Sequence, residues 1–397
     1  MIITDKKINV LEVITLKGSA DAFIGDQLSF FQENGNYEMH LICSPDPTLD
    51  VFAQKYNIKY KAIKICRTLS ILNDILAFFQ IFKYILRNNI KILIAHNFPK
   101  ACLLSMTAGF LARVPIRIEI AHGALQEGVS GFLRKLVICT FKYTSFLATK
   151  VIIVSKSVAQ VRINDGIDKK EKQVILLNGS SNGVDAINFF NPDLYSIESI
   201  KELKQQYNIN DDDIIIGFCG RLVHDKGVTE LLEGFDKICK KYKEKRIKLL
   251  IIGAPEKRDA LPQKTIDILN NNVNIVFTGR IPYKDIPKYY LLMNMLVLPS
   301  YREGFPTVVL EASAMRIPVI VSRKTGCIDS IQENITGIYT DIDNDNISLS
   351  IEKLLDEQIA RKMGDNGRKW VLANYEHILI KKAMFNFVDN LQKQYLN

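Results

Sequence analysis

Residues 296–320 read LVLPSYREGFPTVVLEASAMRIPVI, and this stretch predicts a strand, a tight turn, a helix and a second strand in succession. The apolar run at residues 295–298 is typical of a buried parallel strand. A polar turn follows at residues 300–305, and its Gly304 can adopt backbone angles that other residues avoid. Pro306 suits the first position of a helix, because its missing N–H costs nothing there. This order places a helix N-terminus at the carboxyl edge of a sheet, which is a ready site for phosphate.

Two glutamates in this stretch have no evident structural purpose. Glu303 lies on the polar turn, and Glu311 lies inside an otherwise apolar helix.

Length and composition limit the class of protein. A chain of 397 residues is too long for one ordinary core, so two domains are expected. Hydrophobic content of 47% and charged content of 24% are typical of a soluble globular protein. Seven cysteines without a CxxC pair favour a reducing cytoplasm over secretion. The N-terminus lacks a signal-peptide pattern, and polar residues interrupt the best candidate for a membrane span, residues 69–86.

The positive charge is concentrated in the first half of the chain. Residues 1–185 contain 23 Lys and Arg against 15 Asp and Glu, whereas the remainder contains 29 against 28. A basic half indicates an acidic partner, such as a nucleic acid, an anionic lipid or a phosphorylated substrate. A lysine-rich composition without any such partner explains the numbers equally well.

The first half alternates strands and helices, which predicts a parallel sheet covered on both faces. Its loop at residues 15–20 has no GxGxxG, which argues against a dinucleotide-binding site. Gly18, His96 and His122 each follow the carboxyl end of a predicted strand, where open α/β sheets bind ligands. Because Gly123 lets a ligand approach the backbone, His122 is the strongest candidate, although a lone histidine is more often structural.

A helix predicted at residues 131–149 interleaves apolar and basic side chains. Such a helix can lie on an anionic membrane surface. It can also be a core helix with a solvated basic face, and we prefer this second interpretation.

The second half begins again with the same type of unit. Small polar residues at 176–185 (LLNGSSNGVD) indicate a crossing between domains. A strand at residues 214–219 then leads into Gly220, Arg221 and Lys226 before a helix N-terminus. Arg221 can bond two oxygens through its planar fork, and Lys226 adds a point charge, so this loop is a suitable cradle for a diphosphate. Cations at strand ends are also common on plain surfaces.

We therefore predict a first domain at residues 1–185 and a second at residues 186–374. A long helix is expected from Trp370 onward, and its last part, residues 375–397, is expected to return to the first domain.

Several motifs resemble family-4 retaining glycosyltransferases of the GT-B fold. In the second domain these are Gly220-Arg221 with Lys226-Gly227, Phe277-Thr278-Gly279, Pro299-Ser300, Glu303-Gly304-Phe305-Pro306, Glu311-Ala312 and Pro318-Val319-Ile320. In the first domain, residues 96–101 (HNFPKA), 120–123 (IAHG) and the linker 179–185 resemble transferases that build bacterial capsules, O-antigens and protein glycans. The resemblance covers nearly the whole chain. It implies two Rossmann-like domains facing each other across a cleft.

The resemblance also implies roles for single residues. Arg221 and Lys226 would hold the diphosphate of a nucleotide sugar and neutralise the leaving group, so neither a metal nor a cofactor is expected. Glu311 would accept hydrogen bonds from the ribose, and Glu303 would face the transferred sugar. Eight residues on a helix span about 12 Å, so these two carboxylates can reach different ends of one donor. His122 would approach the donor sugar from the first domain.

The rest of the expected donor site is mostly backbone. N–H groups from Gly304 to Thr307 would lie over the sugar and phosphate, Arg280 and Ile281 near the base, and Gly18 in the cleft. Members of the family often carry a paired glycine where this chain has Lys17-Gly18-Ser19-Ala20. The donor-binding residues expected besides the charged ones are Gly18, Gly220, Arg280, Ile281, Gly304, Phe305, Pro306 and Thr307.

The function implied is transfer of a sugar, from a UDP-hexose or UDP-N-acetylhexosamine, to a lipid-linked glycan at the inner face of the plasma membrane. Retention would follow from attack on the same face as departure, with the leaving phosphate taking the proton. A glycosidase with two catalytic carboxylates has no use for a diphosphate cradle. A sugar-nucleotide epimerase of the same fold and a non-catalytic protein of polysaccharide assembly remain as alternatives. A nucleic-acid-binding protein is disfavoured, because no recognisable motif accompanies the basic half.

Overall fold

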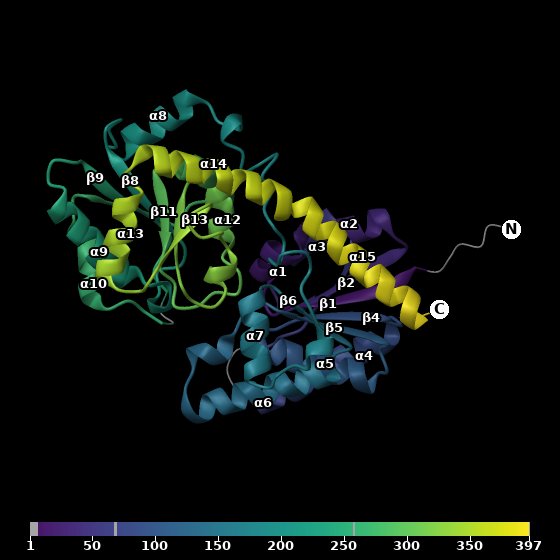
Figure 1. The fold of residues 1–397 in the computed structure, drawn as a ribbon. Helices are drawn as coiled ribbons and strands as arrows, with labels where there is room; N and C mark the ends of the chain where they lie inside the picture. The colour runs from purple at the N-terminus through teal and green to yellow at the C-terminus, as the bar shows by residue number, and fades with distance from the viewer. Residues whose placement is uncertain (1–6, 67–69, 257–258, 397) are drawn as a thin grey trace. The chain divides into compact units, whose positions relative to one another are not determined.

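The computed structural model describes residues 7–66, 70–256 and 259–396. Within these residues the chain forms two compact units (Figure 1). Unit 1 comprises the residues up to Asn182 together with the segment from Ile380, and unit 2 comprises Gly183–Leu379. Among the described residues, no helix combines the length and the apolar character that crossing a bilayer requires.

Unit 1 is built on a parallel sheet with the strand order β3-β2-β1-β4-β5-β6-β7. Its strands are β1 Ile8–Val13, β2 Tyr37–Cys43, β3 Lys59–Ala62, β4 Ile92–His96, β5 Ile116–Ala121, β6 Lys150–Ile153 and β7 Gln173–Val174. Strand β1 pairs with β2 on one side and with β4 on the other, so the order reverses between β1 and β4. The loops that follow these two strands flank the topological switch point, where sheets of this type bind ligands.

Helices cover both faces of this sheet, as the alternating pattern predicts. Residues of β1 alternate between two cores, because Val10 packs with Leu28 and Val388 while Leu11 packs with Ile81. One face is covered by α1 Lys17–Phe23, α2 Gly25–Asn34, α3 Leu49–Tyr56 and α15 His377–Leu396. The other is covered by α4 Ile71–Arg87, α5 Pro99–Leu111, α6 Gly131–Leu147 and α7 Lys156–Asn164.

Helix α6 is only partly a core helix. It buries Phe141 and Leu147 against unit 1. Its outer face exposes Phe132 to 81% and Phe146 to 73%. The expectation of a core helix whose solvated face is basic is therefore wrong for this outer face, which also carries large apolar side chains.

Unit 2 repeats the same architecture with the strand order β10-β9-β8-β11-β12-β13. Its strands are β8 Ile214–Cys219, β9 Ile247–Ile252, β10 Ile275–Gly279, β11 Met295–Leu298, β12 Val319–Ser322 and β13 Gly337–Thr340. Its helices are α8 Ile197–Gln206, α9 Val228–Lys241, α10 Gln263–Asn271, α11 Ile286–Tyr290, α12 Thr307–Ala314, α13 Asn344–Lys353 and α14 Glu357–Asn374. Unit 1 contains the short 3-10 turns η1 Leu125–Gly128 and η2 Lys170–Lys172. Unit 2 contains η3 Pro192–Leu194, η4 His224–Lys226, η5 Tyr283–Asp285 and η6 Cys327–Asp329. Both domains are thus parallel α/β sheets, which confirms the predicted fold class.

The strand–turn–helix–strand stretch lies at the centre of unit 2. Strand β11 pairs with β8 and with β12, and α12 between them is buried on nearly all sides. Pro306 precedes the helix as its N-cap residue, whereas the first helical position was expected. The single long helix expected from Trp370 is also wrong, because α14 ends at Asn374 and the backbone at Glu376 bridges to Val184 before α15 begins.

Candidate active site

Two loops meet at the switch point of unit 2. One follows β8 and leads to α9, and the other follows β11 and leads to α12. The backbone N–H of Tyr301 donates to the carbonyl oxygen of Asp225 at 2.8 Å. Gly227 has φ +66°, and a Cβ there would lie 2.1 Å from the carbonyl oxygen of Pro299. Only glycine fits such a close approach, so the two loops form one surface at the carboxyl edge of the sheet.

Lys226 and Glu303 form an ion pair across these loops. Their side chains are only 16% and 13% exposed. Ser300 Oγ donates to Glu303 Oε1 at 2.9 Å, and the N–H of Glu303 donates to Thr325 O at 2.9 Å. The structure therefore brings together a cation and a carboxylate that were predicted from motifs far apart in the chain. Glu303 is held by two partners, which suits a group that orients a ligand.

Arg221 and Arg302 belong to the same two loops, and each forms an ion pair with a carboxylate other than Glu303. Arg221 is 61% exposed and donates to Glu256 at 3.0 Å. Arg302 pairs with Asp225. Because an exposed ion pair contributes little free energy, Arg221 can leave Glu256 for a stronger anion. The structure places Arg221 and Lys226 on one loop, and Lys226 is the more buried of the two.

Glu311 is buried in α12, at 6% exposure. Tyr290 Oη donates to Glu311 Oε2 at 2.8 Å. Burial raises the pKa of Glu311 to about 7, and the Tyr290 hydrogen bond opposes this rise. Burial also raises the pKa of Tyr290 well above its ordinary value, so the phenol stays a donor. Near neutral pH the Glu311 carboxyl therefore carries a proton for part of the time.

The other residues predicted to bind the donor follow strands of unit 2 or lie at the start of α12. Gly220 follows β8 and lies so close to Gly253 that a Cβ on Gly253 would lie 1.8 Å from the Gly220 carbonyl oxygen. Arg280 is exposed at the end of β10, and Ile281 packs on the core. Gly304, Phe305 and Thr307 keep backbone N–H groups at the start of α12, whereas Pro306 has none to offer. The N–H row expected from Gly304 to Thr307 is thus interrupted at Pro306.

In unit 1, four side chains form a hydrogen-bonded chain, which we call the Glu12–Ser181 chain. Glu12 Oε2 lies 2.9 Å from His96 Nε2, and His96 Nδ1 lies 2.7 Å from His122 Nε2. His122 Nδ1 lies 3.0 Å from Ser181 Oγ. Both ring nitrogens of His122 therefore have partners within unit 1, and its ring also packs against Phe23 at 4.4 Å.

The structure corrects or extends the expectations for unit 1. Gly18 lies in the first turn of α1 instead of in a loop, and it is exposed. Glu12 was not identified from the sequence, although a single carboxylate in the apolar strand INVLEV was a usable signal. His96, the weaker histidine candidate, proves to be the central link of the Glu12–Ser181 chain.

The sequence is similar to known enzymes over its whole length. Residues 199–370, which lie within unit 2, match the family described as glycosyl transferases group 1. The chain is 28% identical over 391 residues to the capsular polysaccharide biosynthesis glycosyltransferase CapM of Staphylococcus aureus, covering 98% of this chain and 99% of that protein. Unit 2 therefore carries a glycosyl transferases group 1 domain, and the chain is a glycosyltransferase.

Two further comparisons agree with this family. This glycosyltransferase is 28% identical over 297 residues to the N,N'-diacetylbacillosaminyl-diphospho-undecaprenol alpha-1,3-N-acetylgalactosaminyltransferase of Campylobacter jejuni, covering 72% of this chain and 73% of that one. Its fold matches the crystal structure of Anabaena Alr3699/HepE in complex with UDP, with a TM-score of 0.78 at 17% identity, covering 97% of this chain and 100% of that one. The predicted GT-B fold and the prediction of a glycosyltransferase are therefore confirmed.

Among the residues that the structure describes, two groups each bring three possible metal ligands within 4.8 Å of one another. One comprises His224, Asp225 and Asp259, and the other comprises Asp185, Glu376 and His377. In the first group, Asp225 already pairs with Arg302, and Asp259 Oδ2 accepts the Asp225 N–H at 2.8 Å. In the second, Glu376 Oε2 accepts the Ala186 N–H at 2.9 Å. Asp185 Oδ1 also accepts the Asn188 N–H at 2.7 Å, so protein contacts account for the carboxylates in both groups.

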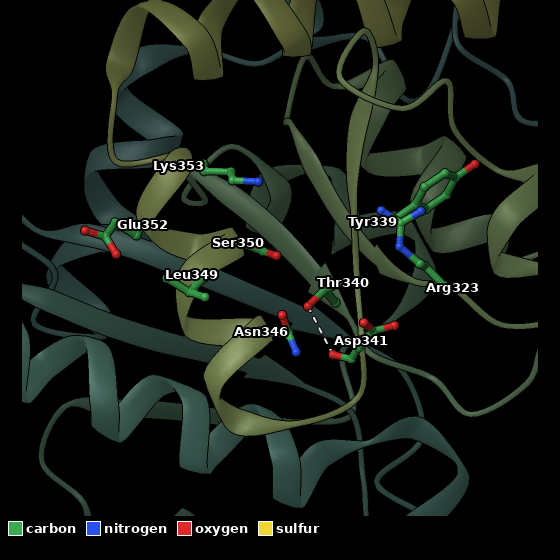
Figure 2. Close-up of a pocket in the computed structure, with 9 residues that line it drawn as sticks. All are labelled: Arg323, Tyr339, Thr340, Asp341, Asn346, Leu349, Ser350, Glu352 and Lys353. Atoms are coloured by element: carbon green, nitrogen blue, oxygen red, sulfur yellow. Dashed lines mark hydrogen bonds between the residues drawn. The ribbon is translucent and has the colours of Figure 1, made fainter.

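A hollow in unit 2 is lined by residues other than those predicted to bind the donor. Figure 2 shows its lining, which comes from the end of β12, from β13 and from α13. The lining residues are Arg323, Tyr339, Thr340, Asp341, Asn346, Leu349, Ser350, Glu352 and Lys353. Arg323 stacks on Tyr339 at 5.0 Å from the ring centroid, and the lining includes none of the residues expected to bind the donor.

Proposed function

We propose that this glycosyltransferase moves a hexose or N-acetylhexosamine from a UDP-sugar to a lipid-linked saccharide, with retention of anomeric configuration and without a metal. The observation that carries this proposal is the largely buried pair of Lys226 and Glu303 at the switch point of unit 2. A cation and an oriented carboxylate there match the two ends of a sugar diphosphate. The Campylobacter jejuni relative, whose name specifies an undecaprenol-linked acceptor, supports the acceptor class.

The donor would be bound by both loops of unit 2. Lys226 would bind the diphosphate as a fixed positive charge, and Arg221 would join it after leaving Glu256. These two cations would neutralise the leaving group, and for this reason we propose that no metal is needed. The backbone N–H groups of Gly304 and Thr307 at the start of α12 would add donors for the phosphate.

The sugar and the nucleoside would contact different carboxylates. Glu303 would orient the transferred sugar, and Glu311 would accept hydrogen bonds from the ribose hydroxyls. Arg280 and Ile281, at the end of β10, would lie near the base. In unit 1, His122, which follows β5, and Gly18, which lies in the first turn of α1, are proposed to contribute to sugar transfer.

The reaction would proceed on one face of the sugar. The bond between C1 and the diphosphate oxygen breaks, and the acceptor oxygen forms a new bond to C1 on the same face. The acceptor proton passes to the departing phosphate oxygen, so atoms and charge balance without a side-chain nucleophile. Glu303 would act by position only, because Lys226 and Ser300 already hold its carboxylate.

The lipid-linked acceptor requires access to a membrane surface. We propose that unit 1 contacts the anionic inner face of the plasma membrane through α4 and α6, which both pack against α5. These two helices expose large apolar side chains: Ile71, Leu72, Ile75, Leu76, Phe79, Leu86, Phe132, Leu133, Leu136 and Phe146. On α6, the exposed Lys135 lies between Leu133 and Leu136 in the sequence, and its positive charge suits an anionic surface.

The test is analysis of the product. The full chain is incubated with UDP-hexoses and UDP-N-acetylhexosamines and with a lipid diphosphate-linked saccharide, with and without EDTA. Mass spectrometry should show one added sugar, NMR should show the anomeric configuration of the donor, and EDTA should not change the rate. Free sugar or an epimerised UDP-sugar as the only product would contradict the transfer reaction. An inverted linkage would contradict the mechanism, and inhibition by EDTA would contradict metal independence.

A further inference from the structure

The Glu12–Ser181 chain links four separate segments of unit 1. Glu12 lies on β1, His96 ends β4, His122 follows β5 and Ser181 follows β7. Glu12 and His96 are only 2% and 1% exposed. Each link is 2.7 to 3.0 Å long, so one proton occupies each link. A contact of this kind between four segments is specified by the fold and not by local sequence.

Burial keeps the inner members of the chain neutral. Burial raises the pKa of Glu12 to about 8 and lowers the pKa of His96 to about 3. It also lowers the pKa of His122, and the neighbouring His96 lowers it further. Among the described residues, only His96 shifts the pKa of another member of the Glu12–Ser181 chain through its charge, and the pKa it shifts is that of His122.

A neutral imidazole has one donor and one acceptor nitrogen, so the donor-to-acceptor direction of one hydrogen bond fixes that of the next along the Glu12–Ser181 chain. With Glu12 protonated, its O–H donates to His96 Nε2, and His96 Nδ1–H donates to His122 Nε2. His122 Nδ1–H then donates to Ser181 Oγ. With Glu12 ionised, every direction reverses without movement of a heavy atom, and the Ser181 hydroxyl becomes the donor.

We propose that Glu12 and His96 are positioning residues that set the tautomer of His122 and, through it, decide whether the Ser181 hydroxyl accepts or donates. The proposal rests on the proposed function, in which His122 takes part in sugar transfer. Glu12 and His96 touch no substrate in this proposal. They act only by fixing the orientation and the proton position of the histidine beside Gly123.

The experiment reads the ring protons directly. The full chain is labelled with 15N-histidine, and long-range 1H–15N spectra are recorded between pH 6 and pH 9.5. Variants that replace His96 or His122 assign the signals among the five histidines. Near pH 7, both His96 and His122 should carry their proton on Nδ1. Above about pH 8, both should move to the Nε2 tautomer with one common midpoint.

Two variants define the cause. Glu12→Gln should abolish the transition of both histidines, because its amide does not ionise. Glu38→Gln is the matched control. Glu38 Oε2 lies 3.6 Å from His40 Nε2 in the same sheet, and neither residue belongs to the Glu12–Ser181 chain. This variant should leave the transition unchanged.

Separate midpoints for His96 and His122, or a transition that survives Glu12→Gln, would overturn the proposal. The wild-type titration alone decides the matter if Glu12→Gln fails to fold. The spectra require no turnover. If the wild-type protein showed the coupled transition of His96 and His122 but no transferase activity, the proposed function would be wrong while the tautomer coupling stood.

Discussion

Glu311 provides the sharpest test of the donor site, because its carboxyl is half protonated near neutral pH. Ribose hydroxyls donate best to an ionised carboxylate, so binding of UDP should be coupled to loss of the Glu311 proton. With a pKa of about 7 in the free protein, one carboxyl in eleven is ionised at pH 6 and nearly all at pH 8. The affinity should therefore rise about tenfold between pH 6 and pH 8, or about 1.4 kcal/mol.

The assay is isothermal titration of UDP into the wild type and into Glu311→Gln. The terminal phosphate of UDP itself titrates near pH 6, so the ratio of the two affinities at each pH isolates Glu311. Wild type should bind about 10-fold to 100-fold more tightly at pH 8, because a charged hydrogen bond contributes roughly 1.5–3 kcal/mol. This advantage should shrink about tenfold at pH 6.

Proton release gives a second reading of the same coupling. At pH 6.5, titrations in buffers of different ionisation enthalpy should show that wild type releases about three quarters of a proton more than Glu311→Gln. An affinity ratio that does not change with pH, together with equal proton release, would refute the role of Glu311 in ribose binding.

Three further predictions concern other parts of the chain. Lys226→Ala should lower kcat/KM about a hundredfold or more in a nucleotide-release assay, whereas the exposed Arg221→Ala should cost less, on the order of tenfold. Wild type should bind anionic vesicles more weakly at high salt, and the variants Phe132→Ser and Lys135→Glu should bind them more weakly than wild type does. Phe141 is buried, so a substitution there does not test this surface. Because the folded-state pKa of Glu12 is raised from 4.5 to about 8, its stabilising contribution is present below pH 4.5 and lost as the pH rises to about 8. Wild type should therefore lose up to about 5 kcal/mol relative to Glu12→Gln over that window, measured by hydrogen exchange of β1 amides in both proteins at each pH.

The fold could be predicted because its signals are local. The apolar strand at residues 295–298, the turn around Gly304 and the proline before α12 each constrain the backbone by themselves. The order of such units then leaves few topologies for a parallel sheet. The break near Tyr375 and the helical state of Gly18 were missed, since neither carries a glycine or proline signal that decides it.

The partners of the site residues were beyond the sequence. Glu303 and Lys226 were both chosen, but their ion pair joins residues 77 positions apart. Glu12 was overlooked because its partner His96 lies 84 positions away, and a lone glutamate in a strand does not reveal what it meets. Strand order decides both contacts. The sequence pattern identifies which residues reach the edge of a sheet, and the fold decides which of them meet.

The measurement closest to the central claim is nucleotide release from a panel of UDP- and GDP-sugars in the presence of a lipid diphosphate-linked acceptor. Wild type and the control Lys237→Ala, whose lysine pairs with Asp345 on the surface of unit 2, should release UDP from at least one donor. Lys226→Ala should be slower by about a hundredfold or more on that donor. Release by Lys226→Ala at the wild-type rate, or no release from any donor by wild type, would contradict the assignment of the two loops of unit 2 as the donor site.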